Sequence, residues 1–522
     1  MTIFVNHNII NVYLYKNNKE IAAMKKSVRL MTAILVLAML WGMCVSCAQT
    51  TGGEDTTAAA STDSPAPVNS QTVAEETEIA LSNIPDDMKF DGTTINLLYW
   101  DDVPNTEFFV DTTNGESVND AIYNRNAKIE EQFGITLNFI GTPGDYNNQK
   151  SFVNTCLNST MSGADAYDIF CGYSMTGASV MIQGISQNLK NYEILDFDKP
   201  WWPETLMSKA TIKDGVYFVS GDISTNFLYM MYLCIFNKDM FAEVTQSNAS
   251  ELYGAVNSGE WTLDKFIEYT TGMYSDLDGN QAPSIGDRYG LAVTEVHFDA
   301  FYTGADMLTV EVNSDGDLVM SDDLFSQKAS DVVDTVYYLL NKSGDAEIEK
   351  GINSFKGDNV LFVIERASCL SRHLSGVDFT YGILPIPKYD VDQEGYKTCL
   401  SFPYTMYMIS TAAPNSTAAA ATIQLMAYES YVEITPALFE ESMKSRYADQ
   451  SDDAMMFDYI REGVVIDIGR LFTKQLDNLS YSVFRGAVAK GTAGGYMSSA
   501  ARYSKTFASK LKSINESLAN LQ

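Results

Sequence analysis

Three side chains that could bind a polar ligand follow directly after an apolar stretch of the chain. Ile95–Tyr99 has the pattern of a buried strand, and Trp100, Asp101 and Asp102 come next. An indole ring offers a flat apolar face that can stack on a ring of a ligand, and a carboxylate can accept hydrogen bonds from two hydroxyl groups. The same residues also suit structural positions, with Trp100 in the core and Asp101 capping a turn.

Further aromatic and charged side chains are of a type that contacts ligands in clefts. They are Tyr173, Trp201, Trp202, Asp222, Arg372 and Tyr404. Two adjacent indoles in a loop cannot easily both enter a core, because neighbouring side chains point in different directions. Each of the others also has a structural explanation, as a packed tyrosine, a turn residue beside a glycine or a member of a surface ion pair.

The stretch DLDGNQAPSIGD has the spacing of a calcium-binding loop. Asp276, Asp278, Asn280 and Asp287 occupy positions one, three, five and twelve, and oxygen ligands at these positions can surround Ca²⁺. Gln281 occupies position six, where the sharp turn favours glycine. A hairpin with solvated acids is the alternative. No other cofactor is predicted.

Strand and helix patterns alternate at the start of the folded region. The expected strands are 95–99, 135–139 and 167–171, and the expected helices are 117–133, 149–161 and 178–187. Later, 216–219 is expected to be a strand, 263–273 a helix, 416–444 largely helical and 500–518 an amphipathic helix. Repeated strand–helix–strand units predict a mainly parallel sheet, in which ligands bind beyond the carboxyl ends of the strands.

The N-terminus has the pattern of a secretory signal. Basic residues precede the uncharged run Leu30–Met43, and Cys47 follows in MCVSC, which resembles a bacterial lipobox. Residues 1–46 are therefore expected to be a signal peptide, with Met24 as the true start and Cys47 as the lipidated residue. An uncleaved membrane anchor is the alternative. Residues 47–88 are rich in Thr, Ala, Ser and Pro, which predicts a disordered tether.

Composition excludes several classes of function. The chain of 522 residues has 67 acidic and 35 basic residues, and its formal charge of −32 argues against nucleic-acid binding. His7, His297 and His373 are the only histidines, which disfavours a histidine-based triad or a zinc hydrolase. The seven cysteines show no paired spacing in the folded region, so no disulfide framework is expected. A glycosidase needs only two placed carboxylates and stays open.

The order of several motifs completes the sequence information. These motifs are MCVSC, INLLYWDD with VNDAIYNRNAKIEEQFGITLNF, YDIFCGYS, NLKNYEILDFDKPWW, DGVYFVSGD with FLYMMYLCIFNKDMF, WTLDKF, DLDGNQAPSIGDRYGL, FKGDNVLFVIERAS, GVDFTYGILPIPKY and SFPYTMYMIS. In this order they resemble the extracellular solute-binding lipoproteins of ABC importers, of the larger sugar-binding type. The resemblance covers most of residues 91–522, and its strength lies in the order rather than in any single motif.

The resemblance implies an α/β fold of two lobes, with a hinge and a ligand cleft between them. By analogy, lobe one takes residues 89–222 and 375–428, and lobe two takes 223–374 and 429–522. The implied protein is a monomer, held outside the cell membrane by a lipid. It delivers a small solute, expected to be an oligosaccharide, to the permease of the importer and performs no chemistry. A secreted glycosidase and a surface adhesion or sensory protein on the same fold remain alternatives.

Overall fold

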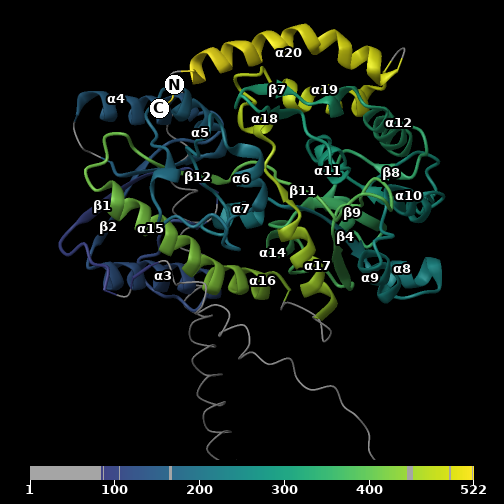
Figure 1. The fold of residues 1–522 in the computed structure, drawn as a ribbon. Coiled ribbons are helices and arrows are strands. Elements are labelled where there is room, and N and C mark those ends of the chain that lie inside the picture. Colours follow the sequence, from purple (N-terminus) through teal and green to yellow (C-terminus); the bar gives the residue numbers. More distant parts are fainter. Residues whose placement is uncertain are drawn as a thin grey trace, which may run out of the picture. The chain divides into compact units, whose positions relative to one another are not determined.

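The computed structural model describes residues 84, 85, 87–104, 106–163, 167–443, 451–492, 495–519 and 521 (Figure 1). The described residues all belong to one compact unit. The predicted signal peptide, Cys47 and nearly all of the predicted tether lie outside them. No helix in these ranges is long and apolar enough to cross a membrane.

The first sheet carries the predicted parallel strands. Its strand order is β12-β3-β1-β2, and β1 pairs in parallel with both β2 and β3. The strand that comes last in sequence pairs antiparallel with β3. The strands are β1 (Thr94–Trp100), β2 (Thr136–Thr142), β3 (Ile169–Tyr173) and β12 (Thr405–Ile409). Every residue of β3 and β12 is buried, as expected for strands covered on both faces.

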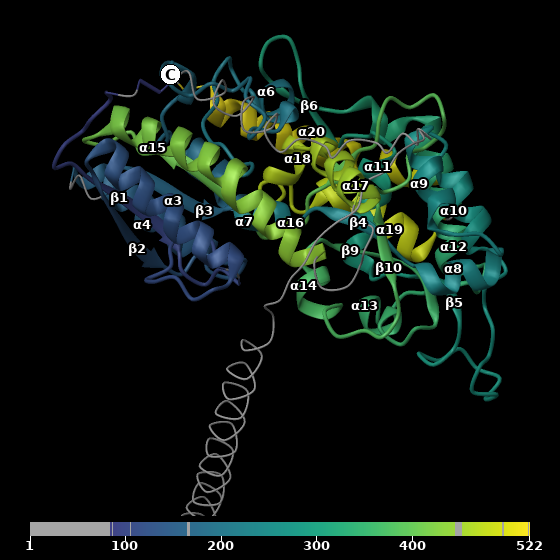
Figure 2. The ribbon, with the colours of Figure 1, turned by 90° about the horizontal axis from the view of Figure 1, so that it is seen from below.

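Helices from two distant parts of the chain cover this sheet, and together they form the first lobe. They are α3 (Ser117–Phe133), α4 (Gln149–Ser162), α5 (Ser174–Ile182), α6 (Glu204–Ala210), α15 (Ser416–Glu429) and α16 (Thr435–Met443). Figure 2 shows α15 lying along α3. The predicted end of α3 at Gly134 is confirmed, with φ of 68°. Ser117 does not cap this helix, because the helix already begins there and Glu116 holds the capping position.

The second sheet mixes parallel and antiparallel pairs in the order β10-β4-β9-β5-β8. Its strands are β4 (Tyr232–Asn237), β5 (Tyr289–Ala292), β8 (Ala346–Glu347), β9 (Val360–Arg366) and β10 (Tyr381–Leu384). The carboxyl ends of β5 and β9 lie at the same edge, because these two strands run parallel. This edge also holds the start of β4, since β4 runs antiparallel to β9.

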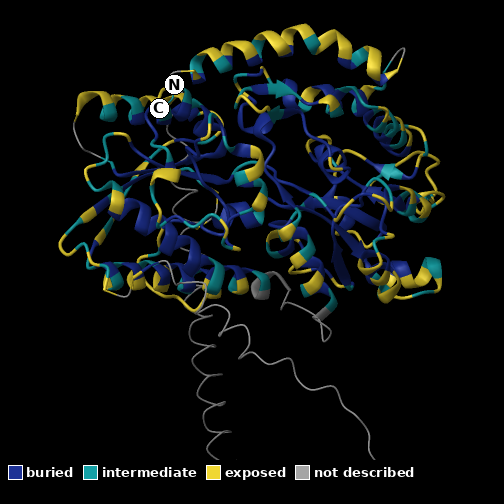
Figure 3. Ribbon diagram, in the orientation of Figure 1, coloured by how far each residue is buried: buried dark blue, intermediate teal, exposed yellow. Residues whose placement is uncertain are grey.

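The helices around the second sheet complete the second lobe. They are α8 (Lys238–Thr245), α9 (Ala249–Asn257), α10 (Leu263–Thr270), α11 (Asp299–Gly304), α12 (Gln327–Asn341), α13 (Ile352–Phe355), α14 (Cys369–His373), α17 (Ser451–Glu462) and α19 (Leu479–Lys490). Thr262 caps α10 as predicted, since its side chain accepts from the backbone N–H of Lys265. Figure 3 shows that the buried residues concentrate in the two sheets and on the helix faces turned toward them.

Two chain crossings between the lobes lie side by side. The first contains α7 (Thr225–Tyr229), and the second contains β11 (Thr398–Cys399), which pairs with β13 (Val464–Val465). Met231 and Leu400 form a bridge between the crossings, and the N–H of Ser401 donates to the carbonyl of Met230. Paired segments of this kind can flex together as a hinge.

The lobe boundaries differ from the predicted ones at two places. β10 was expected in lobe one with 375–428, but it pairs with β4 in the second sheet, so the return crossing comes after it. α16 was expected in lobe two with 429–522, but it packs on α3 of the first lobe. Residues 216–219 were expected to be a strand, yet only Val219 pairs, with Tyr407, before the chain turns at Gly221.

The C-terminal part of the chain lies over both lobes. Its helices here are α18 (Ile468–Leu471) and α20 (Tyr496–Leu518). They contact a hairpin formed by β6 (Val310–Val312) and β7 (Leu318–Met320). α18 packs on α5 of the first lobe and on β6, while α20 contacts α5, β7, α12 and α19. The predicted amphipathic tail helix is thus confirmed and starts slightly earlier.

A buried acid fastens α17 to the second lobe. The Asp453 carboxylate accepts from Tyr253 Oη at 2.5 Å, from Lys238 Nζ at 3.1 Å and from the N–H of Ile383. We expect Asp453→Ala to lower the free energy of unfolding by about 3–5 kcal/mol, because it removes the buried charged acceptor of an ion pair and of two further hydrogen bonds. Urea unfolding measures this loss. Asp452→Ala, one residue away, is the control, and equal losses in both variants would contradict the assignment.

Candidate functional site

The first predicted ligand residue, Trp100, lies inside the first lobe. Its side chain is fully buried, and its Nε1 donates to the Thr405 hydroxyl at 2.8 Å. The ring meets Tyr173 edge-on at 5.5 Å between centroids. In this conformation Trp100 therefore supports the aromatic residue above it and presents no free face to a ligand. Of the two positions considered from the sequence, Trp100 therefore occupies the one in the core.

The neighbouring acids have different positions. Asp101 is exposed, and its backbone N–H donates to the carbonyl of Thr142 at the end of the edge strand β2. Asp102 accepts from the N–H of Gly144 at 2.9 Å and from Nδ2 of Asn148 at 3.1 Å. Asp102 thereby fixes the turn that precedes α4.

Two predicted residues, Tyr173 and Tyr404, come together in an aromatic group at the junction of the lobes. Both rings stack on Phe402, at 6.1 Å and 6.3 Å between centroids, and Tyr404 meets Phe227 edge-on at 5.6 Å. Burial raises the pKa of both tyrosines far above the ordinary value, so their hydroxyls stay neutral. The group joins the end of β3 to the second crossing.

Two guanidinium groups converge on one buried carboxylate of the second lobe. Arg470 Nη1 donates to Asp299 Oδ2 at 2.7 Å. Arg485 donates from Nε to Oδ1 at 3.1 Å and from Nη2 to Oδ2 at 2.5 Å. Arg470 also lies over the ring of Phe402 at 5.1 Å, and Arg485 over the ring of Tyr481 at 4.3 Å. The charged group is therefore continuous with the aromatic group.

A second acid keeps this wall close to neutral. Asp467, at the N-cap of α18, accepts from the N–H of Gly469 at 2.8 Å and from the hydroxyl of Thr309 at 3.0 Å. Burial raises its pKa to about 6, against the opposing effect of the Arg470 charge. Above that pH, Asp467 and Asp299 together balance the two arginines.

The carboxyl edge of the second sheet adds another polar group. Nε2 of His297 lies 3.2 Å from Oε1 of Glu365, and Arg366 Nε donates to the same oxygen at 2.9 Å. Burial disfavours the charge on Glu365, but the adjacent His297 and Arg366 outweigh it and hold the pKa at about 2. Tyr232 Oη donates to Ser401 Oγ at 3.1 Å, which connects this edge to the second crossing.

A pocket of about 440 Å³ lies where the carboxyl end of the first sheet faces the loop between α18 and α19. Its lining residues are Tyr146, Asn147, Gln149, Met175, Thr473, Lys474, Asp477 and Asn478. The rim tyrosine, Tyr146, is 59% exposed. Asp477 and Asn478 both have positive φ, 51° and 66°, which is a strained conformation for residues other than glycine. Strain of this kind is concentrated at binding sites.

One buried acceptor in the pocket has no partner. Gln149 is 4% exposed, and its Nε2 donates to the Tyr146 carbonyl at 3.3 Å and to the Met175 sulfur at 3.6 Å. Among the described residues, Oε1 of Gln149 has no hydrogen-bond partner, and neither does the buried hydroxyl of Ser174 at the start of α5. A buried polar atom without a partner costs about 1–3 kcal/mol. A polar ligand group that reached this atom would remove that cost.

The other predicted ligand residues lie away from this pocket. Trp201 and Trp202 are both buried, and Trp201 packs on Tyr428 and Tyr431 of the first lobe. The expectation that two adjacent indoles in a loop cannot easily both enter a core is wrong here. Both are buried because the loop lies between packed helices. Arg372 donates to the carbonyl of Pro104 across the lobe junction, at 3.3 Å.

The predicted position of Asp222 near a hinge agrees with the structure, but its carboxylate is occupied. It accepts from the hydroxyl of Thr435 at 2.8 Å and lies 3.6 Å from Nε of Arg461. These partners belong to α16 of the first lobe and α17 of the second. In the described conformation, Asp222 joins the lobes.

Sequence reasoning missed most of the pocket and the charged wall. Asp299, Arg470, Tyr481 and Arg485 belong to segments that showed no motif, and Phe402 was not singled out although it lies in SFPYTMYMIS. The signal that could have found Gln149 was its place at the first turn of a helix after a predicted strand, where such sheets bind ligands. Nothing in the sequence pairs residue 299 with residues 470 and 485.

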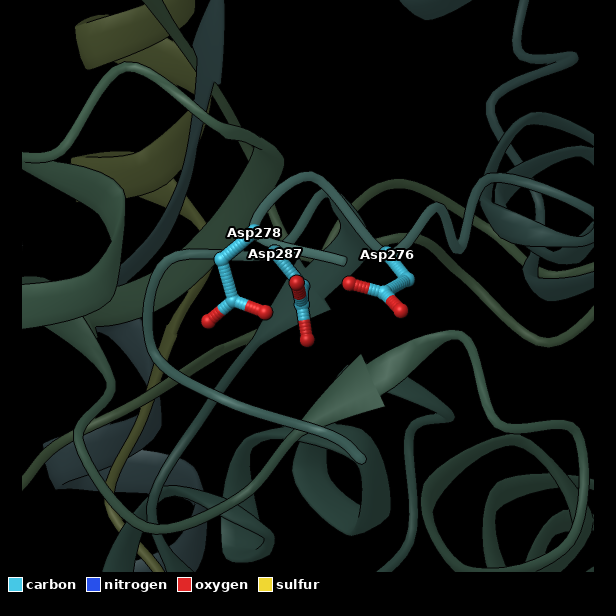
Figure 4. Close-up of side chains that lie close together, drawn as sticks. All are labelled: Asp276, Asp278 and Asp287. Carbon is cyan, nitrogen blue, oxygen red and sulfur yellow. The ribbon is translucent and has the colours of Figure 1, made fainter. Parts of the chain in front are cut away.

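The calcium-like loop forms a compact carboxylate group at the far end of the second lobe. Ligand oxygens of Asp276, Asp278 and Asp287 lie within 4.8 Å of one another (Figure 4). Gln281 has φ of 60°, so the residue at position six adopts the turn conformation that favours glycine although it is glutamine. Asn280 donates from Nδ2 to Asp278 at 2.7 Å rather than offering its oxygen with the three acids. Calcium binding at this loop stays a prediction.

Comparisons with known proteins bear on the fold. Neither the models of known protein families nor the curated proteins include a match to this chain. Among solved structures, it is similar to the cyclic alpha-maltosyl-1,6-maltose binding protein from Arthrobacter globiformis, with a TM-score of 0.52, 14% identity and coverage of 81% of this chain and 99% of that chain. It is also similar to the extracellular solute-binding protein from Staphylococcus aureus in complex with maltose, with a TM-score of 0.50, 12% identity and coverage of 83% and 98%.

A third similar structure is a cyclo/maltodextrin-binding protein complexed with maltotetraose. Its TM-score is 0.50 at 11% identity, with coverage of 83% of this chain and 100% of that chain. Identities this low establish the fold. The chain has the two-lobed α/β fold of periplasmic-binding-protein type that its sequence resembled.

The Glu365 environment gives a pH prediction. The folded pKa of about 2 lies below the ordinary 4.5, so Glu365 contributes stability above pH 4.5 that is lost as pH falls toward 2. The full contribution is about 3 kcal/mol. We expect Glu365→Gln to lower the free energy of unfolding at pH 6 and to approach the parent below pH 3. Denaturant unfolding across this range measures it. Exposed Glu349→Gln is the control, and a Glu365→Gln deficit that is independent of pH would contradict the prediction.

The calcium-like loop gives a second prediction. If it binds Ca²⁺ with the millimolar affinity of extracellular sites, 10 mM Ca²⁺ raises the melting temperature by about 2–4 °C over an EDTA-treated sample. Asp278→Asn should abolish the rise, whereas exposed Asp322→Asn should keep it. An equal rise in both variants, or none in the parent protein, rejects the metal site.

Proposed function

We propose that this chain is the substrate-binding lipoprotein of an ABC importer, capturing an oligosaccharide between its lobes and delivering it to a permease. The observation that carries the proposal is the pocket at the carboxyl end of the first sheet, where the buried Gln149 acceptor has no partner. Ligands bind at this edge in open α/β sheets. An amide acceptor beside aromatic rings suits hydroxyl groups on an apolar ring.

Electrostatics favour a neutral ligand at this site. Asp299 and Asp467 balance Arg470 and Arg485 above pH 6, so the adjacent wall carries no net charge despite the acidity of the chain. Of the three similar structures named above, two are complexes with maltose and maltotetraose, and the third is a cyclic alpha-maltosyl-1,6-maltose binding protein. A neutral glucose oligosaccharide is therefore the first ligand to test.

The proposed protein binds its ligand without chemistry. Asp299 is held between two arginines, and Glu365 is held ionised beside His297 and Arg366. A glycosidase needs one carboxyl that stays protonated near the scissile bond, and neither of these acids suits that role. Asp467, whose pKa is raised to about 6, is buried, and its carboxylate already accepts from the N–H of Gly469 and the hydroxyl of Thr309. The site differs from the sequence-based one, since Tyr146, Gln149 and the loop 473–478 take the place of Trp100 and Asp101.

The cellular part of the proposal rests on the N-terminal sequence. The signal pattern and Cys47 support lipid anchoring at the outer face of the cell membrane, and residues 47–88 would hold the lobes away from it as a tether. We propose that the protein acts as a monomer and that its partners are the transmembrane subunits of the importer.

A thermal-shift screen followed by calorimetry tests the ligand proposal. Maltotetraose and related glucans should raise the melting temperature progressively as their concentration rises, and they should be recovered intact. Tyr146→Ala and Gln149→Leu should each weaken the affinity about tenfold, through lost stacking and a lost acceptor. Tyr123→Ala, an exposed tyrosine on α3, is the control.

Three results would count against this proposal. Consumption of the saccharide would indicate a glycosidase. Unchanged affinity in both pocket variants would place the ligand elsewhere. No melting shift with any saccharide would reject the carbohydrate class.

A further inference from the structure

The C-terminal helix contacts both lobes along its length. α20 packs against α12 and α19 of the second lobe and against α5 of the first, and Figure 1 shows it lying across both. One face of the helix is buried, from Tyr496 at its start through Phe507 to Leu518 at its end. The outer face is exposed (Figure 3).

The end of the chain is seated on the first lobe. Leu521 lines a cavity of about 450 Å³ together with Gly184, Gln187, Tyr217 and Thr411. Gly184 and Gln187 follow α5, and Thr411 follows β12, so the cavity belongs to the first lobe. The two ends of α20 are thus fixed to different lobes.

A hairpin provides a second connection beneath the helix. Asn515 of α20 donates from Nδ2 to the carbonyl of Leu318 and accepts from its N–H, both at 2.9 Å. In the same hairpin, Asp317 lies 2.5 Å from Nζ of Lys213, which follows α6 of the first lobe. The helix is therefore connected to the hairpin, and the hairpin to the first lobe, on this side of the molecule.

The same helix is attached to the ligand pocket. Nζ of Lys510 lies 2.5 Å from Oδ2 of Asp477, which lines the pocket and has positive φ. Both side chains of this pair are more than a third exposed, and a pair this exposed is weak in water, so it can break and re-form. Asn478, the next residue in this strained loop, also lines the pocket.

We propose that α20 is a strap that limits how far the two lobes separate and that transmits this motion to the pocket through Lys510 and Asp477. When the lobes separate, Leu518 and Leu521 move with the first lobe, whereas Tyr496 stays with the second lobe. The helix then displaces Asp477 through its contact with Lys510, and the loop 473–478 leaves the position that it holds in the pocket.

Hydrogen–deuterium exchange on the full, ligand-free chain tests the strap. Leu518→Ala loosens the end of α20 on the first lobe, and we expect amide exchange in the loop 473–479 to rise about fivefold through more frequent local opening. Lys510→Ala should raise exchange in the same loop. Lys512→Ala changes a side chain that is 78% exposed on the same helix and should leave the loop unchanged.

A helix that only packs on each lobe separately gives a different pattern. In that case Leu518→Ala raises exchange only in its own turn and in residues 184–191, and the strap is rejected. If Leu518→Ala lowers stability throughout the chain, Asn515→Ala replaces it, with the same two outcomes for the pocket loop. The test uses no ligand, so its result is independent of the proposed function.

Discussion

The Asp299 carboxylate receives two guanidinium groups from a part of the chain more than 170 residues away. Removing either arginine would leave the rest of a buried charged group unbalanced and would destabilise the fold. Through Arg470 the group supports Phe402 and the aromatic stack, and through Arg485 it holds the middle of α19. The loop 473–478 lies between these two arginines in the sequence. The side of the pocket that this loop forms therefore depends on the Asp299 carboxylate.

Buried polar contacts between distant parts of the chain also occur at the hinge. The lobes share two paired crossings, and buried polar groups join them on one side, where Asp222 meets Thr435 and Arg461. Polar contacts of this kind are directional and can exchange partners, whereas an apolar interface resists sliding because its close packing must be broken. The junction therefore combines exchangeable polar contacts on one side with the packed aromatic group of Tyr173, Phe402 and Tyr404.

Local sequence pattern was enough to predict β1, β2, β3 and the helices that follow them, because the apolar periodicity of α3 and its glycine end depend on neighbours in sequence. The fourth strand of this sheet, β12, was not predicted. The lobe boundaries were harder, since β10 and α16 joined the opposite lobes from those expected. Tyr173 and Tyr404 were singled out because each lies beside a strand end or a bend, and the structure buries both in the aromatic group rather than in the pocket. Trp100 was misplaced because a ring after a strand can turn inward as readily as outward, and the partner that decides it, Thr405, is 305 residues away.

The central claim is that a ligand sits between the carboxyl end of the first sheet and the loop between α18 and α19. A crystal structure of the complex with the saccharide that stabilises the protein most tests it directly. The account predicts a sugar ring at Tyr146, with a hydroxyl donating to Oε1 of Gln149 and the loop 473–478 on its other side. A saccharide bound outside this pocket, with Gln149 Oε1 still unpartnered, would contradict it.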